Sequence, residues 1–259
     1  MIRWSMLITA EEGRNSKMAG FVKDKEYYSE KAEYYAELCK ASAQDFSSSI
    51  AHAEESAQRR ELSRGGGTIH RGYYCPSPIK DRVIGGCKRG RLISKLPSKP
   101  DTVYEYFFNA SGEMTLANKY AVERGQMYYL QSELITRNDS TARSFVLEDV
   151  TRCPHISGIS ECSYDNGLIS SYEYAAIIGR ADNAFCASID SERYWYDKNR
   201  LITCFMDSYI CGTEILQSLR YDFIYGDGDT PTGYTLKKYV NGEYRASADP
   251  ERVYELLKR

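Results

Sequence analysis

Apolar side chains recur at helical spacing near the start of the chain. Between Tyr28 and Ala57 they are separated by steps of three or four residues, which places them on one face of an α-helix. Asp24 is suited to cap the N-terminus, and Gly65-Gly66-Gly67 is suited to end the helix. The pattern predicts one long helix over residues 24–62, with a run of three serines inside it as the point where it kinks or splits.

After Pro100 the pattern changes to the alternation typical of β-strands. Val103–Phe108 is rich in aromatic and β-branched residues, Asn109–Gly112 is a turn signal, and the chain returns over 113–120. The same unit, an aromatic strand followed by a turn and an apolar return strand, recurs along the chain. Consecutive hairpins without helices between them predict an antiparallel meander. The further predicted pairs are 127–130 with 141–147, 159–164 with 168–174, 193–196 with 201–206, and 219–225 with 233–239.

The C-terminal residues carry helix signals again. Asp249 is a capping residue and Pro250 suits the first helical position, so a short terminal helix is predicted over 249–259. The predicted fold class is α+β, with a long N-terminal helix, a tyrosine-rich antiparallel β-hairpin meander and a short C-terminal helix. We divide the chain into a helical segment (1–65), a basic linker with short elements (66–102) and a sheet with its terminal helix (103–259).

Composition indicates a folded protein and favours a cytoplasmic location. Tyrosine accounts for 23 of 259 residues, while 42% hydrophobic and 27% charged residues are typical of a folded domain. The mean hydropathy is −0.54, and no run of about 18 apolar residues is present to span a membrane as a helix. The apolar run 4–10 is too short for an export signal. The eight cysteines are irregularly spaced, which favours reduced thiols in a cytoplasmic protein.

The sequence contains no recognisable motif for catalysis, a metal or a cofactor. Cys153, His155 and Cys162 lack the second ligand pair that a structural zinc site needs. His52 falls inside the predicted helix, where a structural role is expected. His70, in the basic stretch, has no second histidine at a defined spacing for acid–base catalysis. We therefore predict no catalytic residue, no metal and no cofactor, and leave open a carboxylate pair assembled by folding.

Charge is distributed unevenly along the chain. Residues 59–99 contain eleven basic and two acidic side chains, a balance of +9, whereas the rest of the chain contains 23 basic and 34 acidic ones, a balance of −11. The overall charge of −2 argues against nucleic acid as the main partner, although the basic stretch has the charge and the tyrosines to bind a single strand. Arginine and tyrosine also dominate protein interfaces. The predicted partner-binding residues are Arg71, Tyr73, Tyr74, Arg82, Lys88, Arg89, Tyr194 and Tyr196.

A family resemblance rests on the middle of the chain. The segments Arg71-Gly-Tyr-Tyr-Cys-Pro-Ser-Pro-Ile79, Val83-Ile-Gly85, Arg89-Gly-Arg-Leu-Ile93 and Tyr104-Glu-Tyr-Phe-Phe108, followed by the turn at Gly112, resemble a group of uncharacterised bacterial proteins. Members of this group come from Gram-positive bacteria and are encoded near polymorphic toxins, the setting of immunity proteins. The resemblance covers about residues 24–239 and implies no chemistry.

Sequence and resemblance together favour a non-catalytic immunity protein that binds and neutralises a bacterial toxin domain. The acidic remainder of the chain would attract a basic toxin, such as a nuclease, by electrostatic steering. Three alternatives stay open: a nucleic-acid-binding protein that uses residues 59–99, a structural or adaptor protein, and an enzyme whose site forms only on folding. No membrane partner is expected.

Overall fold

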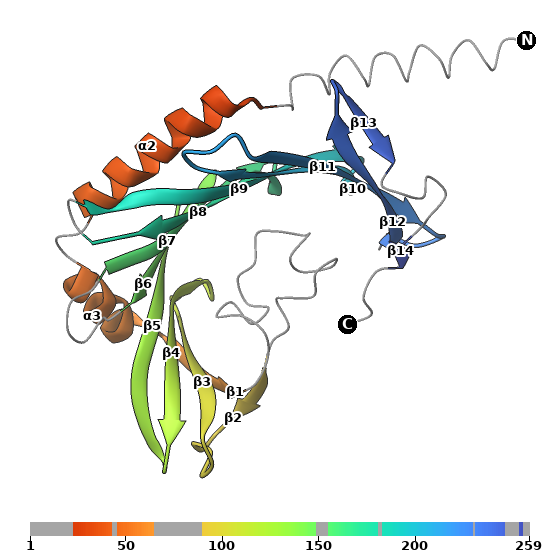
Figure 1. Ribbon diagram of the computed structural model, residues 1–259. Helices are drawn as coiled ribbons and strands as arrows, with labels where there is room; N and C mark the ends of the chain where they lie inside the picture. The colour runs from red at the N-terminus through yellow and green to blue at the C-terminus, as the bar shows by residue number, and fades with distance from the viewer. Residues whose placement is uncertain are drawn as a thin grey trace, which may run out of the picture.

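One antiparallel sheet organises the part of the chain that the structure describes. The structure, a computed structural model, describes residues 23–42, 46–64, 90–148, 155–180, 183–229, 231–246 and 254–255. Thirteen strands lie side by side in the order β13-β12-β11-β10-β9-β8-β7-β6-β5-β4-β3-β1-β2, and β14 pairs with β12 outside this path. The sheet bends into an arch with a convex and a concave face (Figure 1).

Two helices precede the strands, and both lie on the outer side of the arch (Figure 1). They are α2 (Lys25–Ser42) and α3 (Phe46–Ser56). The strands that follow are β1 (Arg59–Arg64), β2 (Arg91–Ile93), β3 (Asp101–Phe108), β4 (Met114–Glu123), β5 (Gln126–Arg137), β6 (Thr141–Glu148), β7 (His155–Asp165), β8 (Leu168–Ile178), β9 (Phe185–Asp197), β10 (Arg200–Ile210), β11 (Leu216–Tyr225), β12 (Pro231–Val240), β13 (Glu243–Ala246) and β14 (Tyr254–Glu255).

The predicted hairpins are confirmed, and their turns have the backbone that the sequence indicates. β7 and β8 are joined through Asn166 and Gly167, at φ 50° and 78°. β12 and β13 are joined through Asn241 and Gly242, at φ 52° and 89°. Asn-Gly supports two successive left-handed residues with little strain, and such turns match the twist of antiparallel strands. Local turn chemistry therefore determines much of the strand order.

The predicted fold class is wrong, because the long N-terminal helix does not exist. The predicted helix 24–62 is divided into α2 and α3, and its last residues form β1 instead. All six residues of β1 pair with β3, from Arg59 opposite Phe108 to Arg64 opposite Val103. These inter-strand hydrogen bonds satisfy the backbone at the edge of the sheet, and this tertiary pairing overrides the weak helical preference of the segment. β1 and β2 thus belong to the same sheet as all later strands.

The predicted C-terminal helix is contradicted in the same way. Tyr254 and Glu255 form β14, which pairs with Tyr234 and Gly233 of β12. The free edge of β12 offers backbone partners that a helix at this position would leave unpaired. The neighbouring residues 247–253 and 256–259 lie outside the described part of the chain. Neither described helix is long and apolar enough to cross a membrane.

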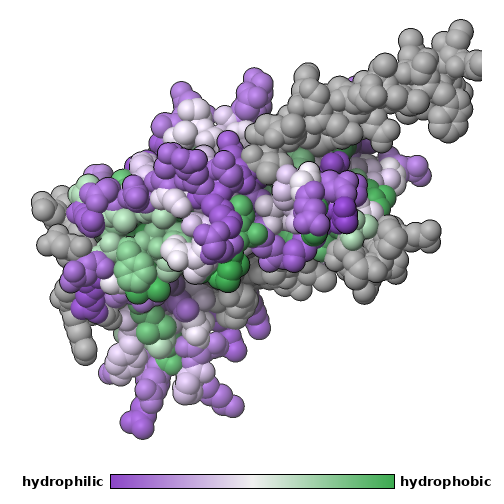
Figure 2. Space-filling model, turned by 45° about the horizontal axis from the view of Figure 1, so that its top comes forward, coloured by the Kyte–Doolittle hydropathy of each residue, from purple (hydrophilic) through white to green (hydrophobic). Residues whose placement is uncertain are grey.

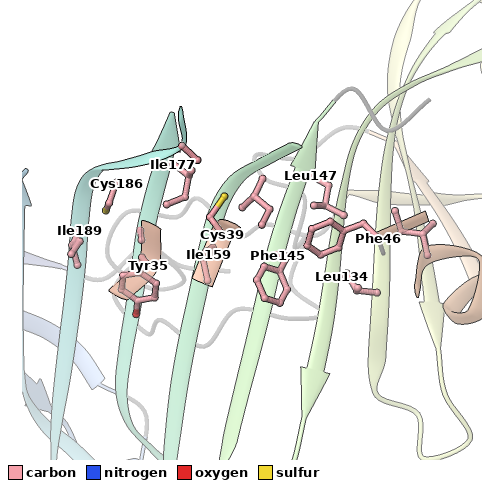
Figure 3. Packing of buried hydrophobic residues seen from close by; sticks show 14 of the residues in the cluster. Tyr35, Cys39, Phe46, Leu134, Phe145, Leu147, Ile159, Ile177, Cys186 and Ile189 are labelled. Carbon is pink, nitrogen blue, oxygen red and sulfur yellow. The ribbon is translucent and has the colours of Figure 1, made fainter. Parts of the chain in front are cut away.

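The two faces of the sheet have separate cores. The convex cluster combines helix residues with Ile, Leu and Phe from the strands, and Figure 3 shows Tyr35, Cys39 and Phe46 reaching the sheet. The concave cluster contains no helix residue and is richer in tyrosine. Alternation along each strand sends successive side chains to opposite faces. The buried members of the concave cluster are Tyr104, Tyr106, Phe108, Met114, Ala117, Ile135, Ala142, Cys162, Tyr172, Tyr194, Cys204, Tyr221 and Phe223.

Tyrosines of α2 are hydrogen-bonded to carboxylates on the convex face. Tyr27 donates to Glu173 Oε2 at 2.9 Å, and Tyr35 donates to Glu173 Oε1 at 3.0 Å. Tyr34 donates to Glu161 Oε1 at 2.8 Å. Glu161 and Glu173 are directly opposite each other on β7 and β8. Like charges in this position repel; the phenol donors of α2, together with Lys31 of α2 beside Glu173 and Arg143 beside Glu161, stabilise them.

A second anchor lies deeper under α2. The Tyr28 hydroxyl donates to Asp207 Oδ2 at 2.6 Å and accepts from Arg193 Nη1 at 3.1 Å. Arg193 also forms an ion pair with Asp207, and both Tyr28 and Asp207 are fully buried. Since a buried charge is tolerated only when it is paired and hydrogen-bonded, the three side chains act as one unit. This unit fixes where α2 crosses β9 and β10.

Removing the hydroxyl of this anchor should destabilise the fold. Tyr28→Phe leaves Asp207 and Arg193 buried with one partner fewer, and we expect a loss of about 1–3 kcal/mol in the free energy of unfolding. Tyr34→Phe is the matched control, because Tyr34 is 40% exposed and its loss should cost less than about 0.5 kcal/mol. Urea denaturation of both variants measures this difference, and equal losses would contradict the role given to the buried anchor.

The same phenols predict a loss of stability at alkaline pH. Burial is the main cause that raises the pKa of Tyr27, Tyr28 and Tyr35, and the neighbouring carboxylates raise it further; burial also raises the pKa of Tyr221, to about 12. In the unfolded chain these phenols ionise near pH 10. Their contribution is therefore fully present below about pH 10 and is lost as the pH rises above it.

The unfolding free energy, measured by urea denaturation, should decline from about pH 10 to about pH 12. Tyrosinate absorbance should rise together with the loss of circular dichroism, because the buried phenols ionise only when the chain opens. A tyrosinate signal that reaches its full amplitude while the protein is still folded would show that the prediction is wrong.

Candidate binding surface

Strand register assembles rows of polar side chains on the concave face. Tyr174 of β8 is opposite Asp190 of β9, and Asp190 is opposite Ser208 of β10. The next row, two residues along each strand, contains Tyr172 and Glu192. Residues directly opposite each other in an antiparallel pair point to the same face. Side chains from three strands therefore form one continuous surface.

The outer row has a phenol among carboxylates. Tyr174, Asp190 and Ser208 are half-buried, and Ser208 Oγ donates to Asp190 Oδ1 at 2.7 Å. Burial, followed by the negative charges of Glu133, Asp190 and Glu148, raises the pKa of Tyr174. The phenol is thus kept neutral at physiological pH and can donate or accept a hydrogen bond. Such a row is suited to binding cations and hydrogen-bond donors of a partner.

The inner row is buried. Glu192 is fully buried and accepts a hydrogen bond from the Tyr194 hydroxyl. Burial is the main cause that raises the pKa of Tyr194 well above its ordinary value, and Glu192 raises it further. Cys204, opposite Tyr194 on β10, is also buried, and burial raises the pKa of its thiol. This row therefore forms the buried part of the same face, next to the outer row.

A glycine makes room for the outer row. Gly158 of β7 is two residues from Ser160, which is opposite Tyr174, and therefore points to the same face. A Cβ added at Gly158 would lie 2.4 Å from the Tyr174 hydroxyl oxygen and 2.8 Å from its Cζ atom. The Tyr174 ring therefore lies against the backbone of β7 at Gly158. Because glycine has no side chain, the ring can take this orientation.

Most of the predicted partner-binding residues lie outside the described residues. These are Arg71, Tyr73, Tyr74, Arg82, Lys88 and Arg89. Tyr194 is 5% exposed and belongs to the concave cluster, so it contributes to the core. Tyr196 is half-buried against the same cluster. Sequence reasoning missed Tyr174, Asp190 and Ser208, and the only local signal was the alternation of polar residues along their strands.

The basic stretch is described only at its two ends, which lie at the β1–β2 edge of the sheet. The Arg59 guanidinium lies 3.9 Å from the centre of the Phe108 ring, and that of Arg60 lies 5.0 Å from the centre of the Phe107 ring. Arg64 Nε lies 3.1 Å from Asp101 Oδ2. These arginines have intramolecular contacts that strengthen the edge. Their side chains are nevertheless exposed, which leaves part of their charge available to solvent.

The structure describes only some of the residues considered for zinc and catalysis. His155 Nε2 lies 3.9 Å from Glu148 Oε2, Cys162 is buried in the concave cluster, and Cys153 and His70 lie outside the described residues. Within the described ranges, no group of three or more His, Cys, Asp or Glu side chains is arranged to hold a metal ion. His52 is on α3 and borders a hollow of about 510 Å³ between this helix and the sheet.

Filling the space at Gly158 should displace the phenol of the outer row. Gly158→Ala is expected to reduce the free energy of unfolding by about 1–3 kcal/mol, because the added methyl group collides with the Tyr174 ring. In a Tyr174→Ala background the same substitution should cost much less, since the colliding ring is gone. A double-mutant cycle by urea denaturation measures the coupling. Additive losses would contradict this contact.

Comparison with known proteins does not identify the chain. No protein-family model matches the sequence, and no curated protein matches it. The case for a function therefore rests on the concave surface, the charge distribution and the resemblance described from the sequence.

Proposed function

We propose that the chain is a cytoplasmic immunity protein that binds and neutralises a bacterial toxin domain without catalysis. One observation carries the proposal: the outer row of the concave face, Tyr174, Asp190 and Ser208, is half-buried and mounted on three paired strands. A rigid surface loses little conformational entropy on binding, and tyrosine contributes large contact area with a polar tip. These properties suit tight binding of a protein.

Charge supports a basic partner. Outside residues 59–99 the chain has a balance of −11, and Asp190 is directly opposite Tyr174 in the outer row. A basic toxin domain, such as a nuclease, would be steered to this surface by long-range attraction. The neutralisation we propose is occlusion, in which the immunity protein covers the active site of the toxin or holds it in an inactive conformation.

The test is a titration of the toxin domain encoded beside the gene for this chain. Toxin activity should fall linearly and end at one chain per toxin, the two proteins should co-purify, and the affinity should weaken as salt is added. Growth of cells that express the toxin should be restored by co-expression. Failure of the two proteins to bind would sink the proposal, and loss of toxin activity at substoichiometric amounts would indicate an enzyme instead.

A nucleic-acid-binding function is the second candidate, because exposed basic side chains line one edge of the sheet. The described members are Arg59, Arg60, Arg64, Arg91, Lys95 and Lys99. Labelled single-stranded DNA in the same titration separates the two functions. Strong, salt-sensitive binding of the DNA without any binding of the toxin would favour this candidate over immunity.

A further inference from the structure

One end of the sheet exposes large apolar side chains on three neighbouring strands and the turn that follows them. Ile178 of β8 and Phe185 of β9 are a directly opposed pair and are 54% and 53% exposed. Ile210 of β10 and Ile215, in the β10–β11 turn, are 44% and 57% exposed, and the Ile210 N–H donates to the Ile215 carbonyl at 3.1 Å. We call these four residues the apolar rim. On the face of the molecule shown in Figure 2, hydrophobic residues lie in patches among hydrophilic ones.

The apolar rim continues into the outer row of the concave face. Ile178 and Tyr174 are four residues apart on β8 and therefore point to the same side of the sheet. Ile210 and Ser208 are two residues apart on β10 and likewise point to one side of the sheet. At about 3.3 Å per residue, Ile178 is about 13 Å from Tyr174 along β8, and Ile210 is about 7 Å from Ser208 along β10. Exposed apolar side chains grouped beside polar ones are typical of an interaction surface.

Charge indicates what binds there. The outer row contributes Asp190, and Glu133 and Glu148 act on the same Tyr174 hydroxyl. Apolar anchors on one side and carboxylates on the other complement a segment that carries apolar residues and, about 7–13 Å away, lysine or arginine.

We propose that the apolar rim and the outer row together form the docking surface for a basic, amphipathic segment of the protein partner. This inference rests on the proposed function, because it identifies which surface the toxin domain would contact. Ile178, Phe185, Ile210 and Ile215 bury the apolar side of the segment, and Asp190 receives its cation. Anchors of this kind account for most of the affinity of an interface, and the charged residues around them provide specificity.

The experiment uses the full chain and a synthetic amphipathic helical peptide of leucine and lysine as the probe. Phe185→Asp combined with Ile215→Asp should weaken peptide binding about tenfold or more. Tyr128→Asp combined with Leu130→Asp is the matched control, since these exposed residues of β5 lie away from the rim, and it should change binding less than about twofold. Circular dichroism and melting curves verify that both variants are folded. Equal weakening by the two double variants would overturn the proposal.

Two further peptides test the charge component. A leucine–glutamate peptide and a serine–lysine peptide should each bind at least about tenfold more weakly than the leucine–lysine peptide. The Asp190→Lys variant should bind the leucine–lysine peptide more weakly than the unmodified chain does. Its binding of the leucine–glutamate peptide should not be weakened. Binding of the leucine–glutamate peptide with equal affinity would overturn the proposal.

The remaining outcomes separate this proposal from the proposed function. If the toxin domain binds and the rim variants bind it as well as the unmodified chain does, immunity stands and the rim proposal fails. If the peptide results hold and the toxin does not bind, the immunity function fails. The rim and the outer row then remain a docking surface for a basic, amphipathic segment. If sedimentation shows a dimer that only the rim variants dissociate, the rim is occupied by a second copy of the chain and the proposal is overturned.

Discussion

The pairing of helix phenols with strand carboxylates is the interaction on which the rest of the structure depends. A single sheet layer is stable only when a second layer covers one of its faces. Here α2 covers the convex face, and it does so through Tyr28 and Tyr35, both fully buried, whose hydroxyls reach Asp207 and Glu173. The rings supply apolar contact, and the hydroxyls satisfy carboxylates that would otherwise be costly to bury. Tyrosine thus covers the convex face with its ring and hydrogen-bonds the buried carboxylates with its hydroxyl. This double role explains part of the high tyrosine content.

The two faces consequently differ in what they are free to do. The convex face packs against the helices, and several of its polar groups have partners from α2 or α3; Asn118 Nδ2, for example, donates to Glu54 Oε1 at 2.8 Å. The concave face has no described helix against it, and its outer row retains half-buried polar groups. The proposed recognition surface is therefore separated from the helix contacts by the thickness of one sheet. Substitutions in the outer row are free to alter binding specificity without removing the contacts that hold α2.

The hairpins were predictable because their information is local. Asn166-Gly167 and Asn241-Gly242 select left-handed turns, and alternation within the flanking strands identifies the sides that are buried. β1 was not predictable from its own six residues, since its identity depends on the edge that β3 offers, more than forty residues later in the sequence. The outer row was missed for the same reason. Tyr174, Asp190 and Ser208 become neighbours only through the register of three strands, and single-sequence patterns do not contain that register.

Register also links the anchor of the helix to the binding surface. On β9, Asp190 and Glu192 point to the concave face, while Ser191 and Arg193, between and after them, point to the convex face. Arg193 is held by Tyr28 and Asp207, so a slip of β9 by one residue would bury the carboxylates under α2 and expose the arginine in the outer row. The cost of such a slip, two buried charges without partners, is several times the stability that one surface contact supplies. The interaction that holds α2 therefore also keeps the concave carboxylates in place. The concave surface is thus preorganised for a partner that binds these carboxylates.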